Sequence, residues 1–344
     1  MEHASSLFDR AYGALMGIAV GDALGMPSQT LTVAQIEAQY GQITDFVAPF
    51  EDHPVSHGLS AGQVTDDTEQ TLIMANRLIA GQGIIVEEDL AKDLLNWETD
   101  VKARGLRDLL GPSSKAALDE LVSGASVSET GRNGTTNGAA MRIAPIGIAC
   151  VVEPVSDFVD QVELACRLTH NTGEAIAAAS AVAAMISCGL DGLNFETSLR
   201  TALHATEEGQ RRGYVVGESS MIDRITDALT IAETCENAAA FAAKTGTSVA
   251  SYQSVPAAFG LVQLAGGDPW KAALMAANIG DDTDTIGAIS CAIAGACTGI
   301  GAFPTKAIAT ISKANRLPLK DVAHSLLSLR NSAETEHQLR EACL

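Results

Sequence analysis

Apolar residues recur along this chain at the three- and four-residue spacing of a helix, as at Leu72, Ala75, Leu78 and Ile79. No segment shows the sustained two-residue alternation of a half-buried strand. Apolar residues make up 47% of the sequence and aromatic residues only 4%, so small aliphatic side chains must build the core. Such side chains suit closely packed helices, and the pattern predicts an all-α protein.

We predict one large globular domain of many helices over residues 1–330, followed by a polar C-terminal tail, 331–344, that frays. No segment resembles a linker, and residues 41–64 form the one long irregular stretch. The predicted helices span 7–20, 66–80, 87–97, 113–123, 138–151, 156–168, 173–188, 195–209, 221–232, 235–245, 255–265, 270–277, 282–299, 305–314 and 319–329.

Composition limits the partners of the chain. The longest apolar runs are shorter than the roughly 20 residues of a membrane span, so we expect core helices and no membrane partner. The first ten residues lack the basic flank and apolar stretch of a secretory signal, which favours a cytoplasmic location. A net charge of −20 should repel phosphate backbones, so we expect no nucleic-acid partner. We expect a monomer or a small homo-oligomer.

Two clusters of carboxylates each stand directly before an apolar helix. The first is Thr65-Asp-Asp-Thr-Glu69 and the second is Asp281-Asp-Thr-Asp-Thr285. One interpretation is helix capping, because Asp and Thr accept hydrogen bonds from free amides at a helix start. A cap needs only one side-chain oxygen, however, and crowded like charges are unfavourable unless a cation neutralises them. The surplus carboxylates therefore indicate a metal site.

The ligand types in these clusters indicate the class of metal. Mg²⁺ and Mn²⁺ take about six oxygen ligands, and neither cluster contains the Cys or His that favours zinc. Asp67 and Asp282 are 215 positions apart, so only the fold can bring the clusters together.

Several segments, in this order along the chain, resemble the ADP-ribosylglycohydrolase family. They are Gly13-Ala-Leu-Met-Gly17, Gly21-Asp-Ala-Leu-Gly-Met-Pro27, Gly62-Gln-Val-Thr-Asp-Asp-Thr68, Asn137-Gly-Ala-Ala-Met-Arg142, Leu168-Thr-His170 and Gly280-Asp-Asp-Thr-Asp-Thr-Ile-Gly287. The resemblance implies an all-α orthogonal bundle of that family's type. It also implies two Mg²⁺ or Mn²⁺ ions held by six residues: Thr65, Asp66, Asp67, Asp282, Asp284 and Thr285.

The resemblance also implies which residues hold a ribosyl substrate. The segment from Arg132 to Gly138 has two Asn-Gly steps, whose glycines let backbone approach a ligand closely, although an ordinary turn would look the same. By the resemblance, Asn137, Gly138 and His170 become substrate-binding residues. We add their neighbour Thr136, and Gln29, which lies two residues after the family segment that ends at Pro27. A lone His such as His170 is also a common structural hydrogen-bonding group. Asp22 is expected to fix the end of the first helix.

The chain departs from the family pattern at three positions. Gln29 stands where many relatives carry Glu, and Gln can neither accept a proton nor serve as a charged ligand. Asp281 and Thr136 stand where glycine is frequent in the family. These changes lie close to the expected site, so they bear on which substrate the chain accepts.

We therefore expect a metal-dependent hydrolase that cleaves the N- or O-glycosidic bond of a ribosyl group. Its substrate would be an ADP-ribosyl conjugate, small or protein-linked, or a related nucleoside-type molecule. Asp67 is the expected catalytic residue, which would touch a metal and orient the attacking water. The alternative is a non-catalytic ligand-binding or structural member of the same fold, resembling crystallin-like relatives.

Overall fold

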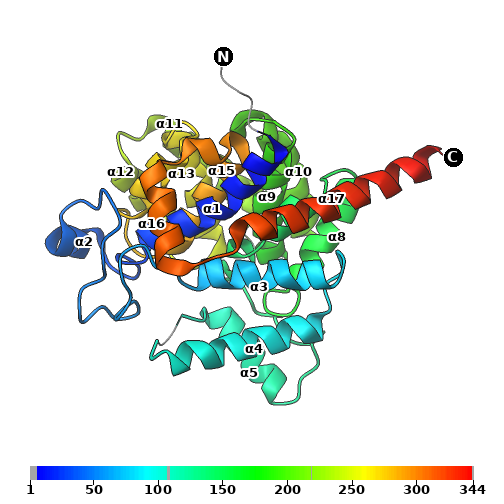
Figure 1. The fold of residues 1–344 in the computed structure, drawn as a ribbon, viewed down its shortest axis with the longest axis horizontal. Helices are drawn as coiled ribbons and strands as arrows, with labels where there is room; N and C mark the ends of the chain where they lie inside the picture. The colour runs from blue at the N-terminus through cyan, green and yellow to red at the C-terminus, as the bar shows by residue number, and fades with distance from the viewer. Residues whose placement is uncertain (1–5, 107–108, 218, 343–344) are drawn as a thin grey trace.

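The computed structural model describes residues 6–106, 109–217 and 219–342, with side chains as far as Ser332. Within these ranges the chain forms α-helices and one short 3-10 helix, with no strand and two isolated backbone bridges. The predicted all-α fold is confirmed, and Figure 1 shows how the helices are arranged.

The helices in chain order are α1 (Leu7–Gly25), α2 (Val33–Tyr40), α3 (Asp66–Ala80), α4 (Glu87–Ala103), α5 (Pro112–Val122), α6 (Gly138–Met141), α7 (Ala144–Ala149), α8 (Val155–Cys166), α9 (Gly173–Leu190), α10 (Phe195–Gln210), α11 (Met221–Thr234), α12 (Ala238–Thr245), α13 (Ser251–Leu264), α14 (Pro269–Ala276), α15 (Thr283–Thr298), the 3-10 helix η1 (Ile300–Ala302), α16 (Thr305–Asn315) and α17 (Leu319–Ala342).

The helices differ from the sequence prediction most clearly at four places along the chain. Helix α1 continues past Val20 because Gly21 and Gly25 lie inside the helix instead of ending it. Helix α2 was not predicted. The single helix expected from Gly138 to Val151 is two helices, α6 and α7, with Pro145 in the first turn of α7, where its missing N–H is tolerated. Helix α17 continues to Ala342, so helical backbone replaces most of the frayed tail that was predicted.

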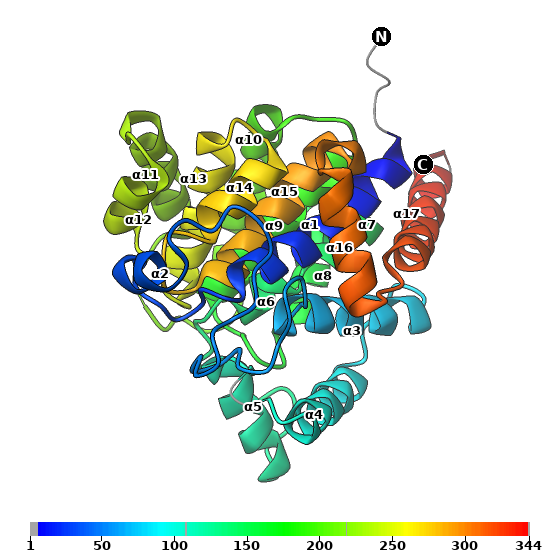
Figure 2. The same ribbon diagram turned by 60° about the vertical axis from the view of Figure 1, so that its left-hand side comes forward.

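Helices α1, α9 and α15 lie at the centre of the molecule, and the other helices surround them (Figures 1 and 2). Every residue of α9 is buried, as are α1 from Ala11 onwards and α15 as far as Ala296. By length and composition alone, α9 could cross a membrane, but it is buried completely inside the protein. Helices α4 and α5 project from one side of α3, as both views show.

Candidate active site

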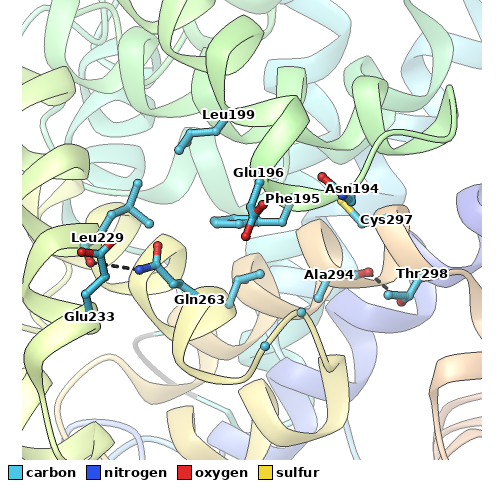
Figure 3. Close-up of a pocket in the computed structure, with 13 residues that line it drawn as sticks. Asn194, Phe195, Glu196, Leu199, Leu229, Glu233, Gln263, Ala294, Cys297 and Thr298 are labelled. Atoms are coloured by element: carbon cyan, nitrogen blue, oxygen red, sulfur yellow. Dashed lines mark hydrogen bonds between the residues drawn. The ribbon is translucent and has the colours of Figure 1, made fainter.

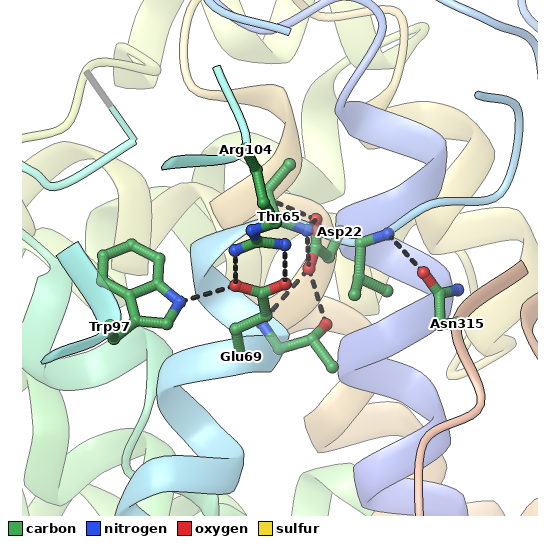
Figure 4. Close-up of polar contacts among 8 residues, drawn as sticks. Asp22, Thr65, Glu69, Trp97, Arg104 and Asn315 are labelled. Atoms are coloured by element: carbon green, nitrogen blue, oxygen red, sulfur yellow. Dashed lines mark hydrogen bonds and ion pairs between the residues drawn. The ribbon is translucent and has the colours of Figure 1, made fainter. Parts of the chain in front are cut away.

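Helix α1 holds the start of α3 through a buried carboxylate. Asp22 accepts hydrogen bonds from the backbone and hydroxyl groups of both Thr65 and Thr68, at 2.6–3.2 Å (Figure 4). These bonds satisfy amides that the first turn of a helix leaves free. At the end of α1, where Asp22 was expected to act, its carbonyl accepts a hydrogen bond from the Met26 N–H, while its side chain fixes the start of α3. The early carboxylate cluster therefore has a defined position relative to α1.

Helix α1 also holds α15, by contact of backbone against backbone. A Cβ atom added at Gly21 would lie 2.1 Å from the carbonyl oxygen of Gly287, and one added at Gly17 would lie 2.2 Å from that of Cys291. Only glycine permits so close an approach. At the start of α15, the Thr283 hydroxyl donates to the Gly25 carbonyl at 2.8 Å. One end of α1 thus sets the positions of both carboxylate clusters.

The two clusters meet. Asp66, Asp67 and Asp284 each offer a carboxylate oxygen within 4.8 Å of the others. Asp67 and Asp284 are buried and Asp66 is partly exposed, and one oxygen of Asp67, Oδ1, has no hydrogen-bond partner among the described residues. Thr285 donates its hydroxyl hydrogen to the other oxygen of Asp67, at 3.4 Å. These carboxylate and hydroxyl oxygens come from two distant segments of the chain. They fit the coordination preferences of a hard divalent cation.

The helix-capping interpretation fails at both clusters. Thr65 and Asp282 stand at the N-cap positions of α3 and α15, and neither side chain makes a capping hydrogen bond. Elsewhere in the chain the same residue types do cap helices, as Ser6 does at α1 and Asp268 at α14. Helix capping therefore does not account for the carboxylates at the start of α3 and α15.

The electrostatics of the cluster also favour a cation. Burial, followed by the charges of Asp66 and Asp284, raises the pKa of Asp67 well above its ordinary value. Burial and the charge of Asp282 likewise raise the pKa of Asp284. For Asp282, burial outweighs the Asn137 hydrogen bond and raises the pKa to about 7. Burial therefore disfavours the charged forms of these carboxyl groups, and a divalent ion would stabilise those forms.

A cavity of about 150 Å³ lies against the carboxylates. Its walls include Asp66, Asp282, Asp284 and Thr285 from the two clusters, and Gln29, Thr136, Asn137 and Gly138 from the predicted substrate-binding residues. Apolar side chains complete the enclosure, of which only Met141 lies in a segment that the sequence analysis singled out: Val55, Leu109, Leu110, Pro112, Met141 and Val249. The lining of the cavity therefore combines carboxylate, hydroxyl and amide groups with hydrocarbon.

The predicted substrate loop is tied directly to the late cluster. Asn137 donates from Nδ2 to Asp282 Oδ2 and also to the hydroxyl oxygen of Ser254, the latter at 3.0 Å. The backbone N–H of Asn137 donates to the Val249 carbonyl at 2.9 Å, which joins the loop to the segment before α13. The loop and the late carboxylates thus form one rigid wall.

His170 lies behind this loop and does not line the cavity. It is fully buried, and its ring packs so closely on Gly138 that a Cβ added there would lie 2.9 Å from Cε1. Thr65 is also buried behind the carboxylates, where it donates its hydroxyl hydrogen to Asp22. The Arg142 guanidinium, at the end of the same family segment, donates to Gln70 and Thr169.

The structure shows the surroundings of two residues that depart from the family pattern, Gln29 and Asp281. Gln29 lines the cavity and donates from Nε2 to the Ser56 hydroxyl at 2.8 Å, so residues of the long irregular stretch hold its amide. Asp281 is exposed and has φ of 65°, in the left-handed region that favours glycine. This conformation accounts for the glycine that is frequent there in the family.

A salt bridge joins α3 to the end of α4. Glu69 of α3 accepts two hydrogen bonds from Arg104, at 2.8 and 2.7 Å, and one from Trp97 at 2.6 Å (Figure 4). Arg104 ends α4, and the chain beyond it supplies Leu109 and Leu110 to the cavity. The sequence showed Glu69 only as a member of the early cluster, because its partners lie about 30 residues away.

A larger cavity, of about 630 Å³, lies between α10, α11, α13 and the far end of α15 (Figure 3). Its lining includes Phe195, Leu229 and Cys297. The carboxylates lie at the start of α15 and this cavity at its end, so helix geometry places them about 20 Å apart. Volume alone would favour this cavity, but the chemistry identifies the smaller one as the candidate active site.

The fold and site define a class of protein: an all-helical protein with a buried carboxylate cluster that could hold divalent cations beside a small, partly apolar cavity. The ADP-ribosylglycohydrolase family model matches residues 3–336, and the chain belongs to this family. The predictions of the family and of an ADP-ribosylglycohydrolase-like hydrolase are thereby confirmed.

Individual relatives and a solved structure are similar to this chain over nearly its full length. The YegU protein of Escherichia coli (strain K12), described as uncharacterized, is 32% identical over 95% of this chain and 98% of its own length. The ADP-ribosyl-[dinitrogen reductase] glycohydrolase of Rhodospirillum rubrum is 26% identical over 94% of this chain and 97% of its own length. A solved structure of an ADP-ribosylglycohydrolase-related protein complex has a TM-score of 0.71 and 25% identity, covering 94% of this chain and 99% of that one.

Proposed function

We propose that this chain is a metal-dependent hydrolase that cleaves the N- or O-glycosidic bond of a ribosyl group. The substrate is an ADP-ribosyl conjugate or a related small nucleoside-type molecule. The observation that carries the proposal is the convergence of Asp66, Asp67 and Asp284 beside the cavity. The R. rubrum relative, which is named for its action on an ADP-ribosylated protein, supports the choice of substrate class.

Six residues would hold two Mg²⁺ or Mn²⁺ ions: Thr65, Asp66, Asp67, Asp282, Asp284 and Thr285. Three observations support this set, namely the proximity of the oxygens, the unpartnered Oδ1 of Asp67 and the raised pKa values of the Asp carboxyls. Bound there, divalent cations would position the ribose hydroxyls and make a water molecule more acidic. The Thr65 hydroxyl donates its hydrogen to Asp22, which leaves a lone pair of its oxygen for a ligand role.

Asp67 is the proposed catalytic residue. Its Oδ1 accepts no hydrogen bond from the described residues, so it can accept one from a water placed for attack at the anomeric carbon. Thr285 donates to the other carboxylate oxygen at 3.4 Å. Asn137, Gly138, Thr136 and Gln29 would contact the ribosyl substrate along the cavity wall, and His170 would support them from behind.

The test is a mass-spectrometric assay of four substrate classes, namely ADP-ribosyl-arginine, ADP-ribosyl-serine, O-acetyl-ADP-ribose and free nucleosides, with Mg²⁺ or Mn²⁺ present. We expect at least one class to be hydrolysed and the thermal midpoint of the protein to rise with one of the ions. No turnover of any class, with no rise in midpoint for either ion, would refute the proposal.

Asp67→Asn is the decisive variant. It should fold, because it relieves crowding among like charges without changing side-chain size, and it should lose most turnover. Asp227→Asn, at an exposed position on α11, is the matched control and should leave turnover unchanged. An unchanged kcat in Asp67→Asn would remove Asp67 from the catalytic role.

A further inference from the structure

A chain of hydrogen bonds runs from a buried cation to the cavity wall. The Arg142 guanidinium, which is fully buried, donates to the hydroxyl oxygen of Thr169 at 2.5 Å. That oxygen lies 2.7 Å from Nδ1 of His170, and Nε2 of His170 lies 3.1 Å from the hydroxyl oxygen of Thr136. Thr136 lines the cavity, whereas Thr169 and His170 are fully buried. The chain therefore connects Arg142 to the one member that a substrate can reach.

The direction of donation along this chain follows from its first member. A guanidinium can only donate, so the Thr169 oxygen accepts from Arg142 and retains its own hydrogen. Among the described residues, Nδ1 of His170 is the acceptor within reach of that hydrogen. Nδ1 therefore accepts, and the hydrogen of the neutral ring resides on Nε2, from which it is donated to Thr136.

The charge on His170 agrees with this direction. Burial, followed by the nearby positive charge of Arg142, lowers the pKa of His170 well below its ordinary value. The ring is therefore neutral near pH 7 and has one N–H hydrogen to donate. Because the Thr136 oxygen accepts that hydrogen, its own hydroxyl hydrogen is available to a partner in the cavity.

We propose that Thr136 is a specificity-determining residue that donates a hydrogen bond to an acceptor oxygen of the substrate. Arg142, Thr169 and His170 are positioning residues that fix this direction of donation. The inference rests on the proposed function and refines the expected role of His170, which acts on the substrate through Thr136. The acceptor is an oxygen of the ribosyl group or of a phosphate attached to it.

The hydroxyl of Thr136 can be removed without losing the contacts of its backbone. Its carbonyl accepts a hydrogen bond from the Ser251 hydroxyl at 2.8 Å, and its backbone pairs with Ala250. Valine has nearly the same shape as threonine and keeps these backbone contacts. Thr136→Val therefore removes the proposed donor, and Thr136→Ser retains it.

The kinetic test compares these two variants with the parent protein on whichever substrate the parent hydrolyses. We expect Thr136→Val to raise KM about tenfold with a smaller change in kcat, and Thr136→Ser to restore most of the loss. Where the parent accepts both an ADP-ribosyl conjugate and a nucleoside, a loss limited to the conjugate assigns the acceptor to a phosphate. A loss on both assigns it to the ribosyl group.

Thr169→Val tests the direction of donation. It removes the donor to Nδ1, so Nε2 of His170 can become the acceptor of the Thr136 hydrogen. We expect a loss similar to that of Thr136→Val, and a double variant no worse than either single variant. Additive losses would contradict the proposed coupling.

Two measurements do not depend on turnover. Nitrogen-15 NMR of the histidine rings should show His170 as the neutral Nε2–H form between pH 6 and pH 8, and calorimetry with ADP-ribose should reproduce the order of the variants. An Nδ1–H form of His170, or equal ADP-ribose affinity and KM in the parent and Thr136→Val, overturns this inference. Absence of turnover in the parent protein, with no rise in its thermal midpoint for either ion, would instead refute the proposed function, and the NMR result would still decide the direction of donation.

Discussion

Helix α15 can approach α1 only because neither helix has a side chain at their crossing, and Gly21→Ala tests how much the site depends on this. The added Cβ would lie 2.1 Å from the Gly287 carbonyl oxygen, whereas ordinary contact begins at 3.4 Å. The two helices must therefore separate by 1.3 Å, the difference between these distances, or deform. Overpacking of this kind costs about 1–3 kcal/mol, against which alanine recovers about 1 kcal/mol of helix propensity.

The displacement acts on the site because α1 holds the early cluster and α15 carries the late one. The carboxylate oxygens lie within 4.8 Å of one another, so a shift of 1.3 Å is a large fraction of their spacing. We expect a net loss of about 0–2 kcal/mol of unfolding free energy, from the balance of the two terms above. Turnover should fall about 100-fold, the usual effect of a 1 Å misplacement.

We would measure stability by urea unfolding, metal binding by the rise in thermal midpoint with Mg²⁺ or Mn²⁺, and turnover by kcat. The matched control is Gly301→Ala, since a Cβ added at that exposed glycine meets no atom within 4 Å among the described residues. If Gly21→Ala were as stable as the parent, bound metal equally well and retained its turnover, the backbone contact would not be what positions the clusters.

Two further predictions follow from the charges around the site. Glu69→Gln should raise KM while costing less than about 1 kcal/mol of stability in urea unfolding, because the pair with Arg104 is partly exposed; an unchanged KM would mean that this contact does not position the cavity wall. Metal-free protein should lose stability as pH rises from about 4 to about 7. Burial raises the pKa of Asp22 to about 6 and of Asp282 to about 7 from an ordinary 3.8, so the folded state binds more protons than the unfolded state in this window. Urea unfolding at several pH values checks this, and a rise in stability across the window would contradict it.

The all-α fold could be predicted from the sequence because helical periodicity is a local property that neighbouring residues determine. The carboxylate clusters were equally visible, since each occupies five consecutive positions. One error came from glycine. Gly21 resembles a helix stop in the sequence, yet it lies inside α1 because the contact with Gly287 requires it, and that contact is not encoded locally.

Only the tertiary structure brought the two clusters together. The sequence gives no sign that Asp22 holds the start of α3, because the hydrogen bonds to Thr65 and Thr68 span more than 40 positions. The direction of donation through His170 likewise depends on Arg142, which is a neighbour in space and not in sequence. The sequence by itself determined which chemical groups this protein carries and which segments are helical. Their proximity and orientation depend on contacts between distant segments, and only folding creates those contacts.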